Sequence, residues 1–246
     1  MKDAVIVNFA SQGRENYLKA QLRMIKSFVE KGWDGDYLIR SLDGWVDQYM
    51  GVPIKNGEYP KPAGVEVIYN HNETPYAFKP NIILEAKEMG YKQVIWVDST
   101  VCMNKNFQPL LDHAKAVGVA AFDNLGHPLR NWISDIALER LGISEEELEQ
   151  IPQVMACVII FDFTNPIGEQ VFSEWLAASQ DGVSFQNGYE SKREGFVKHR
   201  HDQAVLSGLL WKHGIELLPY GNLVYEPHDK TGEYGSFYFF VNRGIV

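Results

Sequence analysis

The chain has 246 residues, of which 45% are hydrophobic and 22% charged, a composition typical of a soluble globular protein. Its formal net charge of −9 gives it no global electrostatic attraction to nucleic acid, so a nucleic-acid partner is disfavoured. No window approaches the roughly 18–20 apolar residues of a membrane span, and the N-terminus lacks the apolar segment of a signal peptide. Two cysteines in apolar surroundings, Cys102 and Cys157, fit a reducing compartment, and we expect a cytoplasmic protein.

The first half of the chain alternates short apolar runs with amphipathic segments. Its predicted strands lie at 4–9, 37–40, 65–69, 93–97 and 117–122, and its predicted helices at 16–31, from Lys79-Pro80 to Gly90, and at 107–116. A long loop rich in Gly, Pro and Tyr is predicted at 43–62. This alternation predicts an α/β fold with a mostly parallel sheet and helices on both faces.

The second half is less regular. Its predicted helices lie at 129–141, 166–178 and 202–213, and its predicted strands at 155–161 and 215–218. Ser144 and Glu147 have the spacing of a capping box that opens a short acidic helix. No linker divides the chain, so we expect residues 1–246 to form a single domain.

The predicted central strand at 93–97 ends abruptly in Asp98, followed by the hydroxyl residues Ser99 and Thr100. In an open α/β sheet, ligands bind at the carboxyl ends of the strands. A carboxylate at such an end can hold a divalent cation, and the cation can hold a diphosphate. The alternative is that Asp98 only caps a turn, as aspartate often does after a strand.

Three further segments, at 76–80, 199–203 and 228–230, accompany this strand end. Together with it they make the chain resemble the GT-A-type nucleotide-sugar glycosyltransferases, with features of the glycogenin-like branch. The sequence Trp-Val-Asp-Ser-Thr at 96–100 is similar to the strand of that family that ends in a metal-binding Asp-X-Asp motif. The resemblance follows the order of elements through most of the chain and implies a Rossmann-like, GT-A-like fold.

The resemblance also implies roles for residues in the later segments. Asp202 and Gln203 match the Asp-Gln pair with which the family opens a helix near the sugar or the acceptor. This makes Asp202 a catalytic candidate together with Asp98, although Asp202 could instead be only the N-cap of its helix. His228 and Lys230 loosely match a C-terminal histidine that reaches the metal and a lysine on the diphosphate.

The chain departs from the family at the second acidic position of the motif, where Thr100 stands. A threonine hydroxyl is a weak neutral ligand, so a Mn²⁺ or Mg²⁺ ion on Asp98 needs another ligand. His228, Asp123 or Asp229 could supply it. Alternatively, the enzyme works without a metal and places arginine or lysine side chains on the phosphates.

The chemistry of glycosyl transfer explains these residue types. When a nucleoside diphosphate leaves the anomeric carbon, negative charge grows on the leaving oxygen and the sugar ring becomes oxocarbenium-like. Cations stabilise the first charge, and an acidic residue such as Asp202 stabilises the second or deprotonates the acceptor. The candidates for substrate binding are Arg14, Lys79, Ser99, Thr100, Gln203 and Lys230.

We therefore expect a glycosyltransferase that moves a hexose, with UDP-hexose as the favoured donor, to an acceptor hydroxyl. Two alternatives stay open. The basic segment 192–201 is the support for a DNA glycosyltransferase that acts on a hydroxylated base, and Thr100 is the motive for a non-catalytic module that binds nucleotide sugars or glycans. The sequence has no P-loop, no Gly-x-Gly-x-x-Gly after its first strand, no Gly-x-Ser-x-Gly and no His-Glu-x-x-His, which disfavours the classes that need them.

Overall fold

The computed structural model of the chain describes residues 2–10, 15–41, 44–45, 48–49, 52–53, 74–188, 191–225 and 237–242. The predicted strand at 65–69 lies outside the described residues. So do four residues that the sequence analysis singled out: Arg14, His228, Asp229 and Lys230.

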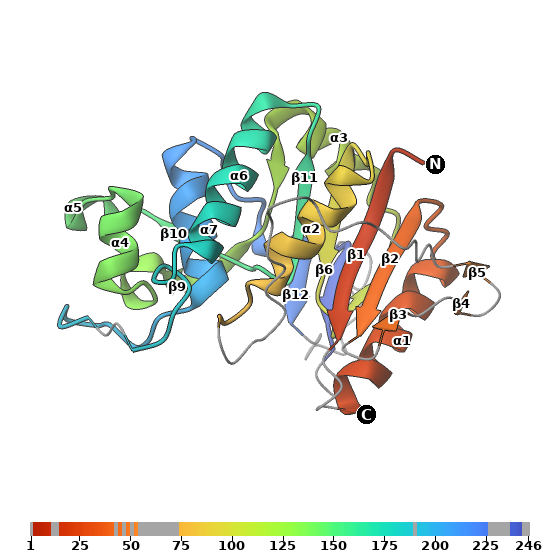
Figure 1. The fold of residues 1–246 in the computed structure, drawn as a ribbon, viewed down its shortest axis with the longest axis horizontal. Helices are drawn as coiled ribbons and strands as arrows, with labels where there is room; N and C mark the ends of the chain where they lie inside the picture. The colour runs from red at the N-terminus through yellow and green to blue at the C-terminus, as the bar shows by residue number, and fades with distance from the viewer. Residues whose placement is uncertain are drawn as a thin grey trace.

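A sheet in the order β3-β2-β1-β6-β11-β8 forms the centre of the molecule (Figure 1). Its strands are, in that order, β3 (Gly44–Trp45), β2 (Asp36–Ser41), β1 (Ala4–Ala10), β6 (Gln93–Val97), β11 (Val158–Asp162) and β8 (Val119–Ala120). The neighbours β2, β1 and β6 are parallel, whereas β11 runs antiparallel to β6 and to β8, and β3 antiparallel to β2. The carboxyl ends of β1 and β6 therefore meet the beginning of β11 at one edge of the sheet.

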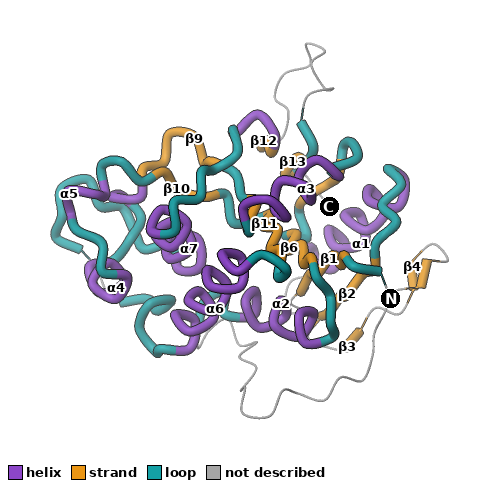
Figure 2. Tube along the Cα trace, turned by 90° about the horizontal axis from the view of Figure 1, so that it is seen from above, coloured by secondary structure: helices purple, strands orange, loops and turns teal. Residues whose placement is uncertain are grey.

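Helices cover both faces of this sheet, as the view from above in Figure 2 shows. The helices α1 (Glu15–Glu30) and α3 (Gln108–Val117) pack on one face, and α2 (Phe78–Glu88), α6 (Pro166–Gln180) and α7 (His201–Lys212) lie on the other side. The predicted α/β fold class is confirmed. Because both faces are covered, the inner strands are apolar at nearly every position instead of alternating with polar residues.

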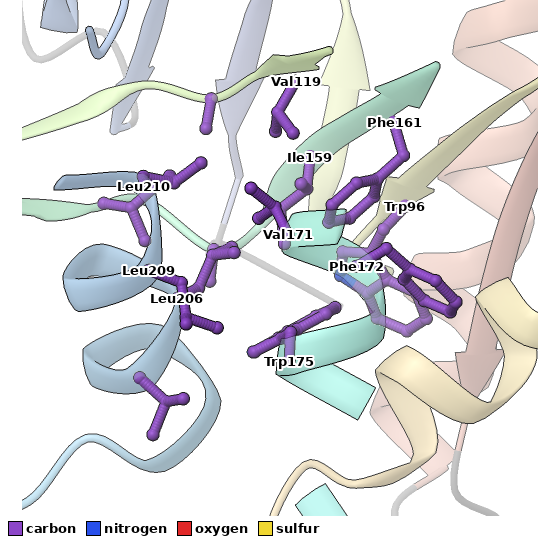
Figure 3. Close-up of a cluster of buried hydrophobic side chains, with 14 of the residues drawn as sticks. Trp96, Val119, Ile159, Phe161, Val171, Phe172, Trp175, Leu206, Leu209 and Leu210 are labelled. Carbon is purple, nitrogen blue, oxygen red and sulfur yellow. The ribbon is translucent and has the colours of Figure 1, made fainter. Parts of the chain in front are cut away.

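Each inner strand contributes to two hydrophobic clusters. In β6, Val94 and Trp96 belong to the cluster with α2, α6 and α7, whereas Ile95 and Val97 belong to the cluster with α1 and α3. The first cluster includes Phe172 and Trp175 of α6 and the leucines of α7, and Figure 3 shows Trp175 on the side of α6 that lies toward Leu206. This packing fixes the beginnings of α2 and α7 next to the end of β6.

A smaller group of elements, formed by residues 123–154, lies on the side of α7 away from the central sheet (Figure 1). These are β9 (Asp123–Pro128), the 3₁₀ helix η1 (Leu129–Asn131), α4 (Asp135–Leu141), α5 (Glu145–Leu148) and β10 (Pro152–Val154). β9 and β10 pair antiparallel, and the capping box predicted at Ser144 and Glu147 is present at the start of α5. Their buried side chains join the same cluster as those of α2 and α6, so one core runs through both groups.

The remaining described elements are short. They are β4 (Gln48–Tyr49), β5 (Val52–Pro53), β7 (Val101–Met103), η2 (Tyr220–Asn222), β12 (Leu223–Tyr225) and β13 (Phe239–Val241). β7 follows the end of β6 and pairs antiparallel with β13, which pairs in parallel with β12. No helix within the described ranges has both the length and the apolar character needed to cross a bilayer.

Several predicted elements differ from the structure: the strand predicted at 117–122 is shortened to β8, and short strands lie within the loop predicted at 43–62. The helix predicted at 129–141 is broken between η1 and α4, because the Ser134 hydroxyl accepts a hydrogen bond from the backbone N–H of Ala137 and starts a new helix. The strand predicted at 215–218 is reduced to one bridge between Phe122 and Leu218. In this segment only Leu218 pairs with a neighbouring strand residue, so the run does not form a full strand.

Candidate active site

Asp98 lies at the edge of the sheet, directly after β6. Its backbone N–H donates to the carbonyl oxygen of Cys157 at 2.8 Å, and its own carbonyl accepts from the N–H of Val101 at 2.9 Å. Its side chain is 35% exposed. The indole Nε1 of buried Trp96, two residues earlier on the same face, donates to Oδ1 of Asp98 at 2.7 Å. The strand end thus presents an oriented carboxylate toward solvent.

Lys79 lies next to this carboxylate, in the first turn of α2. Its Nζ is 2.9 Å from Oδ2 of Asp202 and 3.4 Å from Oδ1 of Asp98, and it donates to the carbonyl oxygen of Ala156 at 2.8 Å. An ammonium group has three N–H donors, and these three protein acceptors match them in number. Only 5% of the side chain is exposed, so Lys79 is a buried link between the two carboxylates.

Asp202 occupies the first turn of α7 and is the most deeply buried member of this charged cluster, which consists of Asp98, Lys79 and Asp202. Its side chain is 4% exposed, and its carbonyl oxygen accepts from the indole of Trp175 on α6 at 3.1 Å. Two helices thus begin at the charged cluster. Their positive ends favour negative charge there, which suits both carboxylates.

The buried pair shifts the pKa of both partners. Burial lowers the pKa of the Lys79 ammonium, but the charges of Asp202 and Asp98 outweigh burial, so the pKa lies above its usual value. Burial raises the pKa of Asp202, and the repulsion of Asp98 adds to this, whereas Lys79 lowers it. Lys79 is therefore charged at neutral pH, and it provides the countercharge that Asp202 needs in the interior.

The hydroxyl residues after Asp98 have structural partners. The hydroxyl of buried Ser99 donates to Oδ1 of Asn8 at 3.2 Å, and Gln21 on α1 donates to the same oxygen at 2.7 Å. Asn8 in turn donates to the carbonyl oxygen of Val97. Thr100 is half-buried, and its carbonyl oxygen accepts from the N–H of Asn242. The Ser99 side chain therefore ties the strand end to β1 and α1.

Gln203, the other half of the predicted Asp-Gln pair, is also held by the backbone. Its Nε2 donates to the carbonyl oxygen of Val154 at 2.5 Å. The hydroxyl of Ser207, one turn later, accepts from the N–H of Val154 at 2.9 Å. Together these bonds attach α7 to β10, so Gln203 sets the position of the helix that carries Asp202.

The rings of Tyr76 and His201 lie near one another beside the charged cluster. The Tyr76 ring centroid is 5.3 Å from Nζ of Lys79 and 5.6 Å from the imidazole centroid of His201. Tyr76 has φ = 62° and His201 has φ = 39°, and among the described residues they alone are non-glycine residues with a positive φ. Such strain is concentrated at functional sites. Tyr76 lies two residues before the start of α2, and His201 is the first residue of α7. These two helices bring the charges together.

Many solved structures have a fold similar to that of the chain, and three glycosyltransferases are examples. They are the apo structure of the bifunctional glycosyltransferase WbbM (TM-score 0.59, 15% identity), the apo form of mouse xyloside xylosyltransferase 1 (TM-score 0.55, 9% identity) and the galactosyltransferase LgtC in complex with donor and acceptor sugar analogues (TM-score 0.51, 15% identity). The chain has the GT-A fold of glycosyltransferases.

The GT-A fold accounts for nearly the whole chain. The similarity covers 100% of this chain and 46% of WbbM, 99% of this chain and 99% of the xylosyltransferase, and 98% of this chain and 87% of LgtC. The chain thus spans less than half the length of WbbM. It matches no protein-family model and no curated protein sequence. At these identities the comparisons establish the fold, and the chemistry must be argued from the site.

The GT-A resemblance implies a divalent cation on Asp98, and the described residues fit one poorly. One oxygen of Asp98 is engaged by Trp96 and lies 3.4 Å from the Lys79 ammonium, and Thr100 offers only a neutral oxygen. Across the described ranges, no three His, Cys, Asp or Glu side chains gather closely enough to hold a metal. Asp123, on β9, belongs to no such group.

The structure adds site residues that the sequence analysis did not select. Asn8 carries a signal in retrospect, because it is a polar residue inside the apolar run of β1. Ala156 contributes only its carbonyl oxygen, which no sequence pattern distinguishes. The backbone strain at Tyr76 and His201 also has no signature, because neither residue type favours a positive φ as glycine does.

Proposed function

We propose that the chain is a glycosyltransferase that transfers a sugar from a nucleoside-diphosphate donor to an acceptor hydroxyl, with UDP-hexose as the favoured donor. The observation that carries this proposal is the charged cluster of Asp98, Lys79 and Asp202 at the carboxyl end of β6. It occupies the edge at which open α/β sheets bind ligands. The GT-A fold supports the proposal, since each of the three similar structures is a glycosyltransferase.

The charge of the cluster suits the sugar better than the phosphates. Two carboxylates and one ammonium carry one net negative charge, and the exposed part of it is Asp98. An oxocarbenium-like ring is positively charged in the transition state. A unit charge at about 4 Å contributes on the order of 4 kcal/mol at the effective dielectric constant typical near a protein surface. Asp98 and Asp202 would therefore stabilise the sugar as the leaving group departs.

The diphosphate needs positive groups other than Lys79, because the three acceptors around its ammonium match its three donors. Arg14 and Lys230 remain our candidates for this role. A Mn²⁺ or Mg²⁺ ion held by Asp98 and His228 would be a further source of positive charge, and we propose it as an addition to be tested. Lys79 instead holds the two carboxylates in place.

An assay with radiolabelled UDP-, GDP- and TDP-sugars, with and without manganese, tests the function. We expect consumption of one donor, and a fall in turnover of about 10²-fold or more in Asp98→Asn, since removing one preorganised electrostatic group typically has this effect. Asp34→Asn, at a carboxylate that is 93% exposed, is the matched control and should behave like the wild type. No binding or consumption of any donor would contradict the proposal. Donor binding without turnover in the wild type would instead identify a non-catalytic module.

The basic segment gives little support to a DNA acceptor. The Arg193 side chain is 8% exposed and bonds to Asp135 and to the carbonyl oxygens of Arg130 and Ile133. Arg200 donates to Gln153. Because these guanidinium groups hold protein segments together, we expect no salt-dependent shift of DNA in a gel. The cytoplasmic location that the cysteine usage indicates stays part of the proposal.

A further inference from the structure

His201, which precedes Asp202, makes a hydrogen bond through one ring nitrogen, and its other ring nitrogen faces no protein partner among the described residues. Nδ1 of His201 lies 2.9 Å from the carbonyl oxygen of Phe185. A carbonyl oxygen only accepts, so Nδ1 carries the hydrogen and Nε2 of the neutral ring keeps its lone pair. Within the described part of the chain, Nε2 has no hydrogen-bond partner, and the half-buried ring is not sealed from solvent. An incoming hydroxyl group can therefore donate to Nε2.

The imidazole stands beside the charged cluster. It is 5.6 Å from the Tyr76 ring, which in turn lies 5.3 Å from Nζ of Lys79. The next residue in the chain is Asp202, the partner of Lys79. A hydroxyl group held at Nε2 would thus lie next to the residues that would surround the donor sugar.

The surroundings favour a neutral imidazole that becomes charged during the reaction. Burial lowers the pKa of His201 below its ordinary value, and the nearby Lys198 also lowers it, whereas the bond to Phe185 and the charge of Asp202 raise it. The other titratable groups that face the ring are Tyr76 and His199, whose ring lies 5.2 Å away. Burial raises the pKa of Tyr76 and lowers that of His199, so both are neutral near pH 7.

The backbone at His201 is strained, and its ring is held by a hydrogen bond. His201 has φ = 39°, a conformation that costs free energy for a residue with a Cβ atom. The bond from Nδ1 to Phe185 holds the ring in this conformation. By contrast, Asp202 is 4% exposed and ion-paired, so its carboxylate is poorly placed to take a proton from an acceptor.

We propose that Nε2 of His201 is the base that receives the proton of the acceptor hydroxyl. This inference rests on the proposed glycosyl transfer. The acceptor oxygen forms a bond to the anomeric carbon while the bond from that carbon to the diphosphate oxygen breaks, and the electron pair leaves with the diphosphate. The hydroxyl proton moves to Nε2, and the resulting imidazolium lies beside the carboxylate of Asp202 until it returns the proton to water.

The variant His201→Asn tests the role of Nε2. Asparagine tolerates a positive φ better than most residues and has no basic nitrogen. We expect its kcat for transfer to fall by about 10²–10⁴, the range of general base catalysis, with unchanged affinity for the nucleotide-sugar donor. The acid limb of the wild-type pH profile should disappear. His213→Asn, at the opposite end of α7, is the control and should keep both the rate and the limb.

Chemical rescue separates the loss of a base from damage to the fold. In His201→Gly the backbone conformation is relieved and the space of the ring becomes free, so added imidazole should restore transfer in proportion to its neutral form. The inference is overturned if His201→Asn transfers sugar at the wild-type rate with the same acid limb. It is also overturned if imidazole restores no activity to a folded His201→Gly protein.

The outcomes of the transfer assays and one further measurement distinguish this inference from the proposed function. Absence of sugar transfer by the wild type contradicts the function itself, whereas transfer that survives the loss of His201 contradicts only the role of the histidine. Nitrogen-15 NMR of the wild type reports the tautomer without any assay. We expect the hydrogen on Nδ1 at neutral pH, and a hydrogen on Nε2 would overturn the inference.

Discussion

At the scale of single residues, the Asp98 carboxylate could be predicted from sequence and its lysine partner could not. An apolar run that ends in an aspartate predicts a strand and a carboxylate at its end, because both signals are local. The pairing of Lys79 with Asp202 joins two helix beginnings that are far apart in the chain. The sequence predicts Lys79 at a helix start, where it could have been exposed to solvent, but the packing of α2 against β1, β6 and α6 buries it.

Removing Lys79 should destabilise the protein more than removing the whole ion pair. Lys79→Met leaves Asp202 buried without a countercharge, and such a change typically costs about 3–5 kcal/mol. The double variant with Asp202→Leu removes the second charge and should recover much of this loss. Urea unfolding of the two variants and the wild type gives the comparison. Equal stability of the single and double variants would show that the carboxylate does not need the ammonium.

A second residue-scale prediction concerns pH. Nδ1 of His199 accepts from the N–H of Ser134 at 3.2 Å, and its Nε2 donates to the carbonyl oxygen of Ser184 at 2.9 Å, so this buried ring must be neutral. Burial and the nearby His201 lower the pKa of His199 to about 4. The unfolded chain, with a histidine pKa of about 6.5, binds this proton more readily. Stability is therefore fully present above pH 6.5 and is lost as the pH falls toward 4.

The expected loss from His199 is up to about 3.5 kcal/mol, since each pKa unit corresponds to about 1.4 kcal/mol. Urea midpoints at pH 7.5, 5.5 and 4.5 measure it. His199→Gln keeps one acceptor and one donor for the same backbone groups but does not titrate, so its stability should depend less on pH over this range. An equally steep dependence in the variant would assign the effect to other groups.

At the scale of elements, close approach of backbones explains how α3 and α6 meet. Gly118, with φ = 98°, ends α3, and Gly168 lies in the first turn of α6. A Cβ atom on Gly168 would lie 2.4 Å from the carbonyl oxygen of Asp162 and 2.5 Å from that of Gly118. These contacts involve backbone on both sides, so relief requires a shift of the helix.

We therefore expect Gly168→Ala to lower the free energy of unfolding by about 1–3 kcal/mol, the range typical of overpacking. Gly221→Ala is the control, because a Cβ atom there meets nothing within 4 Å and the residue does not have a positive φ. Its effect should stay within about 0.5 kcal/mol. Thermal unfolding followed by circular dichroism compares the variants. A neutral Gly168→Ala would mean that α6 shifts without loss of packing.

The spacing of apolar residues predicts the ends of some helices well and of others poorly. Helices such as α1 and α6 were predicted within two residues because one apolar face repeats along them. The helix predicted at 129–141 kept its apolar spacing but broke at Ser134, where a side-chain cap and bonds from Val197 and Arg200 to nearby carbonyl oxygens provide other partners for the backbone. Such long-range partners have no local sequence pattern.

At the scale of the whole molecule, one cluster of buried side chains includes residues of the central sheet and of the smaller group of elements beyond α7. Trp96 on β6 and Trp175 on α6 both belong to it. Separate unfolding of either part would expose this shared surface to water. We therefore expect residues 1–246 to unfold as one unit, with coincident urea transitions by tryptophan fluorescence and far-ultraviolet circular dichroism. Two separated transitions would indicate two domains.

The charged cluster draws its three members from the end of β6 and from the starts of α2 and α7. A ribosome-bound chain that has emerged only through β11 already contains the strand-end carboxylate and its ammonium, but not the closing helix. Such an unfinished chain lacks the second carboxylate and the imidazole beside it. Under the proposed function, sugar transfer would therefore begin only once synthesis has passed α7.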